Sequence, residues 1–179
     1  MNPLRLTKLQ QDIVRLLFIK AGTTLNQRAV AKLLQVSAPA VMKTLPRLEQ
    51  LGFIKITQDE ESRRWAIELN RDNHTVLQLK RADNLKLIYE SGLVDFIEQE
   101  LAGATIVLFG SYSRGEDTET SDLDLAIIGR KEKSINLSKY EKVLGRKINL
   151  NFYEAWSRIH RNLKENLCNG IVLVGGVEL

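Results

Sequence analysis

The sequence predicts a mixed α/β (α+β) chain in three parts: residues 1–70 form a small helical domain that ends in a β-hairpin, residues 71–102 a helical bridge, and residues 103–179 a domain with a mixed sheet. Three observations support this division. Apolar residues recur at helical spacing before residue 52, alternate with polar ones around residues 53–69, and form short apolar runs separated by helical segments after residue 103. A length of 179 residues suits one ordinary domain or two small ones.

Three helices are expected in the first part. The first covers residues 7–20 and the second residues 27–35, capped by Thr7 and Asn26. Ser37 caps the third, which Gly52 stops. Pro46 falls inside this third helix, where it removes a backbone donor and clashes with the preceding turn, so we expect a kink there or a break near Leu45.

A β-hairpin follows, because residues 53–57 and 65–69 alternate apolar and polar side chains around a charged tip. Three helices and such a hairpin make a winged helix-turn-helix. The run that carries the resemblance to MarR-type winged-helix regulators is Val36-Ser37-x-x-Ala40-Val41-x-x-x-Leu45-x-x-Leu48-x-x-x-Gly52-Phe53-Ile54. The resemblance implies binding to double-stranded DNA, although winged helices also dock proteins.

The charge of the chain is uneven in a way that fits a polyanion partner. Residues 1–70 hold 11 Lys and Arg against 6 Asp and Glu, net +5, whereas the remaining residues hold 15 against 16, net −1. In this motif the third helix enters the major groove and the wing lies along the phosphates. The candidate DNA-binding residues are Arg28, Ser37, Lys43, Arg47, Arg63 and Arg64.

Several properties favour a cytoplasmic protein. No apolar stretch is long enough for a membrane span, and the first residues lack the apolar core of a signal peptide. The single cysteine, Cys168, has no intrachain disulfide partner. The bridge is expected to form helices over residues 75–90 and 93–101, and it is a candidate for a homodimer contact.

The strongest functional signal lies between two apolar runs, at residues 104–109 and 123–128. The first run ends at Gly110 and Ser111, where exposed backbone N–H groups can cradle phosphates. The second begins on Asp122 and Asp124, which share one face of a strand because they are two residues apart. Two neighbouring carboxylates repel unless a cation such as Mg²⁺ lies between them. The sequence therefore predicts a site for a metal-bound nucleoside triphosphate.

The spacing Gly-Ser-x10-Asp-x-Asp resembles the nucleotidyltransferase superfamily of DNA polymerase β, and most closely its minimal nucleotidyltransferases, over residues 103–176. The resemblance implies NMP transfer from ATP or another NTP with Mg²⁺ or Mn²⁺. It assigns the β- and γ-phosphates to Gly110 and Ser111, and the metal ions and catalysis to Asp122 and Asp124. Arg114 lies where it could neutralise phosphate charge, but it is equally a surface arginine that caps a helix.

One catalytic position departs from the family pattern. The family has a third carboxylate in Gly-Arg-Lys-Val-Asp-Leu, and the matching residues here are 145–150, with Asn149 in place of the Asp. A carboxamide can ligate a metal but has no charge and cannot accept the hydroxyl proton. Nucleotide binding would then survive while transfer is slow or absent. Alternatively, a nearby carboxylate such as Glu154 substitutes for the missing one.

Beyond the motif, we expect a short helix after Ser113, helices over residues 137–144 and 154–167, and strands over residues 147–153 and 171–174. The leading hypothesis is an enzyme that also binds DNA. Minimal nucleotidyltransferases often act as antitoxins that add AMP to a HEPN-type toxin, which a winged helix would suit by autoregulation. The alternatives are a catalytically degenerate, nucleotide-sensing transcriptional regulator and a docking protein whose winged helix holds a protein or RNA substrate.

Overall fold

The chain divides into two compact units, residues 1–80 and 81–179. The structure is a computed structural model and describes residues 6–58 and 64–176. The boundary between the units lies inside helix α4 (His74–Glu90), in the segment predicted as the helical bridge. Each unit has a hydrophobic core of its own: α4 contributes Val76 to the first core and Ile88 to the second. Among the described residues, no helix has both the length and the apolar character needed to cross a membrane.

The first unit has the predicted three helices and hairpin. Its elements are α1 (Lys8–Ile19), α2 (Gln27–Leu34), α3 (Ala38–Gln50), β1 (Ile54–Gln58) and β2 (Trp65–Leu69). Side chains of Thr7, Asn26 and Ser37 cap the three helices, as the sequence predicts. The strands pair antiparallel, and Leu25 forms an isolated bridge with Ile67, which joins the hairpin to the helices. This arrangement is a winged helix-turn-helix.

The expected break near Leu45 is wrong, because α3 continues through Pro46 to Gln50. Val41, Leu45 and Leu48 are fully buried on both sides of the proline, so packing holds the helix together where one backbone hydrogen bond is missing. The Thr44 hydroxyl also donates to the Ala40 carbonyl over 2.8 Å, in the turn before the proline.

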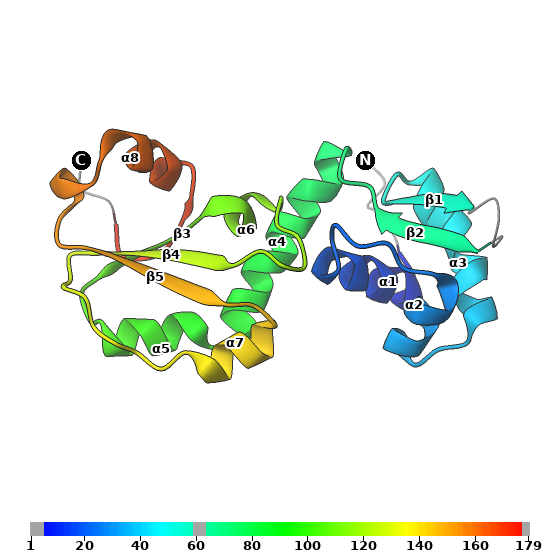
Figure 1. The fold of residues 1–179 in the computed structure, drawn as a ribbon, viewed down its shortest axis with the longest axis horizontal. Helices are drawn as coiled ribbons and strands as arrows, with labels where there is room; N and C mark the ends of the chain where they lie inside the picture. The colour runs from blue at the N-terminus through cyan, green and yellow to red at the C-terminus, as the bar shows by residue number, and fades with distance from the viewer. Residues whose placement is uncertain (1–5, 59–63, 177–179) are drawn as a thin grey trace. The chain divides into compact units, whose positions relative to one another are not determined.

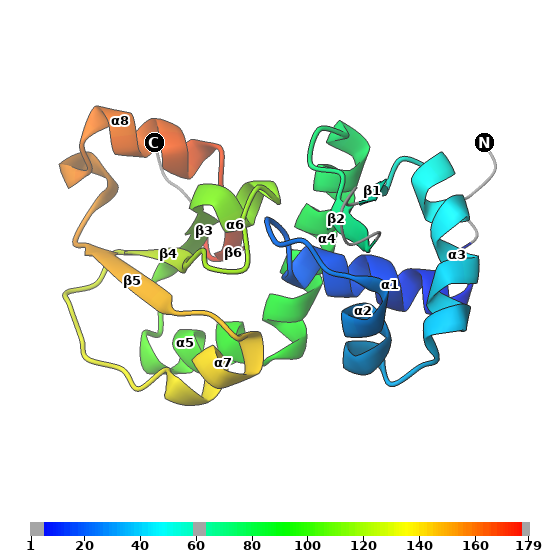
Figure 2. The ribbon, with the colours of Figure 1, turned by 45° about the vertical axis from the view of Figure 1, so that its right-hand side comes forward.

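The second unit is built on a four-stranded mixed sheet in the order β5-β4-β3-β6. Its strands are β3 (Thr105–Phe109), β4 (Leu123–Ile128), β5 (Ile148–Tyr153) and β6 (Ile171–Val174). β3 pairs antiparallel with β4 and β6, while β4 and β5 run parallel. Helices α5 (Leu93–Glu100) and α7 (Ser138–Leu144) lie on one side of the sheet and α8 (Arg161–Cys168) on the other (Figures 1 and 2).

Two predicted helices of this unit differ from the structure. The short helix expected after Ser113 is α6 (Gly110–Arg114), so Gly110 and Ser111 form its first turn and do not precede it. The helix expected over residues 154–167 is a 3-10 turn, η1 (Trp156–Arg158), followed by α8. Ile159 between them is extended and 4% exposed, and its side chain packs against the sheet with Val107 and Ala126.

Candidate functional site

Asp122, Asp124 and Asn149 meet on one face of the sheet. Asp124 is paired in register with Asn149 on the parallel neighbour β5, and Asp122 lies two residues earlier on the same face. The Asn149 amide nitrogen Nδ2 donates to Asp122 Oδ2 over 3.1 Å and to Asp124 Oδ1 over 3.0 Å. The structure thus places Asn149 where the sequence alignment predicts the third carboxylate. Its N–H groups bridge the two aspartates and offset part of their repulsion.

The Gly110 turn closes against the same carboxylates. Gly110 has φ +75°, a left-handed conformation that L side chains rarely adopt, and a Cβ at this position would lie 3.0 Å from Asp124 Oδ2. Phe109, the residue before it, is paired in register with Asp124 across β3 and β4. Inside the turn, the buried Ser113 hydroxyl donates to the Gly110 carbonyl over 2.8 Å. A glycine here lets the backbone of the turn approach the aspartates closely.

The other predicted participants lie in exposed ion pairs. Arg114 Nε is 2.7 Å from Glu116 Oε2, so the arginine has a local partner on the same loop. Glu154, the alternative third carboxylate, follows β5 and is paired with Arg158 four residues on. Asn149, not Glu154, contacts the two aspartates.

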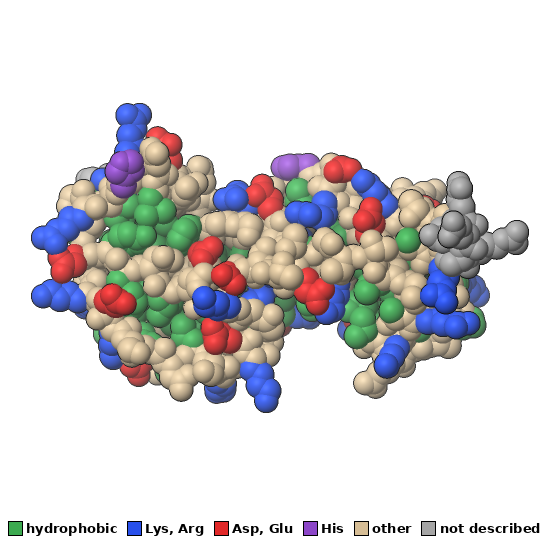
Figure 3. Space-filling view, viewed as in Figure 1, with side chains coloured by type: hydrophobic (Ala, Val, Ile, Leu, Met, Phe, Trp, Pro, Cys, Tyr) green, Lys and Arg blue, Asp and Glu red, His purple; other side chains and the backbone are tan. Residues whose placement is uncertain are grey.

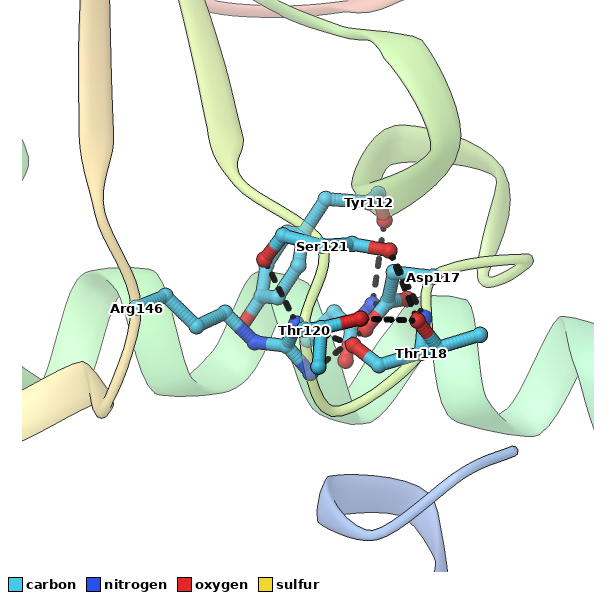
Figure 4. A network of polar contacts seen from close by, with 7 residues as sticks. Tyr112, Asp117, Thr118, Thr120, Ser121 and Arg146 are labelled. Carbon is cyan, nitrogen blue, oxygen red and sulfur yellow. Dashed lines mark hydrogen bonds and ion pairs between the residues drawn. The ribbon is translucent and has the colours of Figure 1, made fainter. Parts of the chain in front are cut away.

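A buried polar network holds the loop that leads into Asp122 (Figure 4). Arg146 Nη2 forms an ion pair of 2.8 Å with Asp117 Oδ2; the two side chains are 6% and 0% exposed. Arg146 Nη1 donates to the carbonyls of Thr118 and Ser121, the second over 2.9 Å. Because Ser121 directly precedes Asp122, the guanidinium fixes the backbone at the start of β4.

Helix α4 and the Tyr112 ring complete this network. Asn84 Nδ2 donates to Asp117 Oδ1 over 2.7 Å and to the Tyr112 carbonyl over 3.0 Å, and the Arg146 guanidinium lies 5.1 Å from the Tyr112 ring centroid. Burial raises the pKa of the Tyr112 hydroxyl, so this ring stays neutral beside the arginine. Sequence patterns do not predict these contacts, although Arg146 lies in the motif that includes Asn149. The available signal was a charged residue, Arg146, two positions before a strand.

The residues at the site fit a divalent cation that prefers oxygen ligands. Among the described residues no cluster of three or more His, Cys, Asp or Glu has a metal-binding arrangement, so an all-carboxylate site is absent from residues 6–58 and 64–176. Asp122 and Asp124 nevertheless present carboxylates on one face. Rotation of the Asn149 amide about its last side-chain bond would replace Nδ2 by Oδ1, giving a third oxygen toward the same point.

The candidate DNA-binding residues of the first unit lie at the surface of the winged helix. Arg28 on α2, Lys43 and Arg47 on α3, and Arg64 before β2 are exposed, while Ser37 caps α3 by accepting from the Ala40 N–H over 3.3 Å. Arg47 also donates to Gln50 over 2.8 Å. Figure 3 shows Lys and Arg side chains over α2 and α3. Arg63 lies outside the described residues.

Comparison with known proteins finds similarity in the second unit. Residues 90–173 match the family model of the nucleotidyltransferase domain. Domains of this kind generally use divalent metal ions. The chain is also similar to MJ1379 of Methanocaldococcus jannaschii, provisionally named as a protein adenylyltransferase, with 42% identity over 53 residues. That alignment covers 26% of this chain and 53% of the relative, so the chain spans about half the length of the curated relative it matches.

Solved structures also resemble part of the chain. MepR, a regulator of the Staphylococcus aureus multidrug efflux pump MepA, is 23% identical with a TM-score of 0.38, over 52% of this chain and 65% of MepR. MepR in a complex with DNA is 21% identical with a TM-score of 0.40, over 54% of this chain and 79% of that chain. ZitR of Lactococcus lactis is 17% identical with a TM-score of 0.41, over 56% of this chain and 65% of ZitR.

Proposed function

We propose that this protein is a cytoplasmic, Mg²⁺-dependent nucleotidyltransferase that transfers AMP from ATP to an acceptor hydroxyl and binds double-stranded DNA through its winged helix. The observation that carries the proposal is the meeting of Asp122, Asp124 and Asn149 on one sheet face beside the Gly110 turn. This constellation offers oxygen ligands for a divalent cation next to backbone that approaches closely enough to hold phosphates.

The proposed roles follow from the positions of the side chains. Asp122 and Asp124 hold the divalent cation, which, when bound, would neutralise triphosphate charge and lower the pKa of the attacking hydroxyl. Gly110 and Ser111 orient the β- and γ-phosphates. The acceptor oxygen forms a bond to the α-phosphorus while the bond from that phosphorus to the bridging oxygen breaks, and pyrophosphate leaves with both electrons. The hydroxyl proton passes to solvent, because Asn149 has no basic oxygen to take it.

A second function, nucleotide sensing without transfer, is favoured by Asn149. Its amide donates to both aspartates and so stabilises the pair without a cation, which a third carboxylate could not do. In this alternative, ATP binding by the second domain changes the DNA affinity of the winged helix. A HEPN-type toxin as acceptor, with autoregulation of a shared operon, remains part of the enzymatic proposal.

The test is transfer of label from ATP. The chain is incubated with Mg²⁺, a HEPN-type protein and ATP labelled either in the α- or in the γ-phosphate, and Asp124→Asn serves as the control variant. Label that enters the acceptor from the α-phosphate alone, and only with Asp124 intact, supports nucleotidyl transfer. ATP binding without transfer, together with a change in DNA affinity on ATP addition, would replace it by the sensing function.

A further inference from the structure

The sheet face that carries the aspartates continues into a partly exposed aromatic surface. Strand alternation places Val107 and Phe109 of β3, Ala126 and Ile128 of β4, and Asn151 and Tyr153 of β5 on the face of Asp124 and Asn149. The observed packing agrees with this alternation. Val107, Ala126 and Ile128 form one small core with residues of the segment around α8, whereas their strand neighbours belong to the core on the opposite face.

Three aromatic side chains on this face are incompletely covered. Phe109, Tyr153 and Trp156, which we call the aromatic patch, pack against the small core but are only partly buried. Burial raises the pKa of the Tyr153 hydroxyl. The Lys164 ammonium lies 5.9 Å from the centroid of the Trp156 ring, so a charged group already lies against this ring. In Figure 3, hydrophobic side chains are exposed between α8 and β4, and acidic side chains follow to the right.

The spacing of the strand residues matches a nucleoside that extends from the aspartates. The row of Asn151 and Ala126 lies two residues from Asp124, about 6.6 Å along the strand, and the row of Tyr153 and Ile128 twice as far. With the β- and γ-phosphates at α6 and the α-phosphate at the aspartates, the nucleoside points away from α6 along this face. A ribose separates the α-phosphate from the base, so the base reaches the rows of Asn151 and Tyr153.

We propose that the aromatic patch binds the nucleobase of the triphosphate, with the base stacked on Trp156 in place of the Lys164 side chain and its polar edge facing the Asn151 amide. This inference rests on the proposed function, since the phosphates set where the nucleoside starts. A flat aromatic ring can stack on any nucleobase, and the larger purine rings gain more from stacking than pyrimidines do. The Asn151 side chain is held beside the patch, because its Nδ2 donates to the Leu125 carbonyl over 3.4 Å.

The experiment compares ATP with inorganic tripolyphosphate, which has the phosphates but no base. The full chain carries Trp65→Phe, so that Trp156 is its only indole. Fluorescence of Trp156 and calorimetric affinity are measured with Mg²⁺ for this chain and for its Trp156→Leu and Trp156→Phe variants. Leucine keeps an apolar side chain in the small core, and phenylalanine restores a ring. Thermal melting checks that each variant folds.

We expect ATP to quench Trp156 fluorescence and tripolyphosphate to leave it unchanged. Trp156→Leu should weaken ATP binding about tenfold or more while changing tripolyphosphate affinity less than twofold, and Trp156→Phe should recover most of the loss. Equal affinity of ATP for the reference chain and Trp156→Leu, or equal losses for both ligands, would overturn the nucleobase site and leave the proposed function standing. If neither ligand binds the reference chain, the proposed function fails and the nucleobase site fails with it. The quenching measurement decides the question without a substitution if Trp156→Leu does not fold.

Discussion

Replacing Asn149 by Asp changes the site in a way that depends on the metal ion. The substitution removes the two hydrogen bonds that Nδ2 donates to Asp122 and Asp124, and it puts a third carboxylate about 3 Å from the other two. Hydrogen bonds to charged groups contribute about 1.5–3 kcal/mol each, and partial exposure of these side chains reduces that figure. We therefore expect Asn149→Asp to destabilise the protein by about 2 kcal/mol in EDTA, which lowers the melting temperature by about 4–8 °C.

With Mg²⁺ the sign reverses, because three carboxylates bind a divalent cation more tightly than two carboxylates and an amide. The third carboxylate also supplies the proton acceptor that Asn149 lacks. This gain is felt in the transition state more than in the bound substrate, so turnover should rise at least about tenfold, or about 1.4 kcal/mol of barrier, with little change in ATP affinity.

The assay follows label transfer from ATP at saturating Mg²⁺, and melting in EDTA and in Mg²⁺, for the wild type, Asn149→Asp and Asn136→Asp. Asn136 is the matched control, since its side chain is exposed and its Oδ1 accepts from the Ser138 N–H over 3.1 Å, a bond that a carboxylate also accepts. If the wild type transfers label rapidly and Asn149→Asp changes neither rate nor melting, Asn149 does not occupy the third carboxylate position and the reasoning is refuted.

Three further predictions concern other parts of the chain. Gly110→Ala should weaken Mg-ATP binding measured by calorimetry, because the added methyl group meets Asp124 Oδ2. Gly145→Ala is the control: this glycine also has a positive φ, +65°, but nothing lies near its Cβ, so the variant should lose about 1 kcal/mol of stability and no ATP affinity. Equal ATP affinities of the two variants would contradict this prediction. Arg146→Leu removes the guanidinium of a buried ion pair with Asp117 and should cost about 3–5 kcal/mol in urea unfolding. Arg158→Leu, whose ion pair is exposed, should cost less than about 1 kcal/mol, and similar losses for the two variants would argue against the buried pair. For four phosphate contacts, the logarithm of the DNA association constant of the full chain should fall against the logarithm of salt concentration with a slope of about −3.6. The double variant Lys43→Gln/Arg47→Gln should make this slope shallower by about 1.8. An unchanged slope would show that α3 does not contact the phosphates.

Local sequence signals predicted most of the architecture. Caps at Thr7, Asn26 and Ser37, and alternating patterns over β1, β2 and β5, place these elements correctly because they depend on neighbouring residues alone. Pro46 shows the limit of such reasoning. Its local penalty is real, but burial of Val41, Leu45 and Leu48 outweighs it, and burial depends on helices and strands distant in the sequence.

The part of the candidate site that lies on one strand, Asp122 and Asp124, was predictable from the sequence. The part built from several segments was less so. The spacing of Asp122 and Asp124 fixes their common face, and the motif placed Asn149 beside them before the register of β4 and β5 was known. The buried polar network that fixes the backbone before Asp122 was not predictable from the sequence. The contact of Arg146 with Asp117 and with the carbonyls of residues 118 and 121 joins a helix end to a loop some 25 residues earlier, and no periodic pattern records that pairing.

The most direct test of the central claim is calorimetric titration of ATP into the full chain with Mg²⁺ and with EDTA, for the wild type and for Asp122→Ala combined with Asp124→Ala. If the two aspartates hold the cation that binds the triphosphate, wild-type affinity should drop at least about tenfold in EDTA, and the double variant should bind weakly in both conditions. Equal ATP affinity in all four titrations would contradict the account.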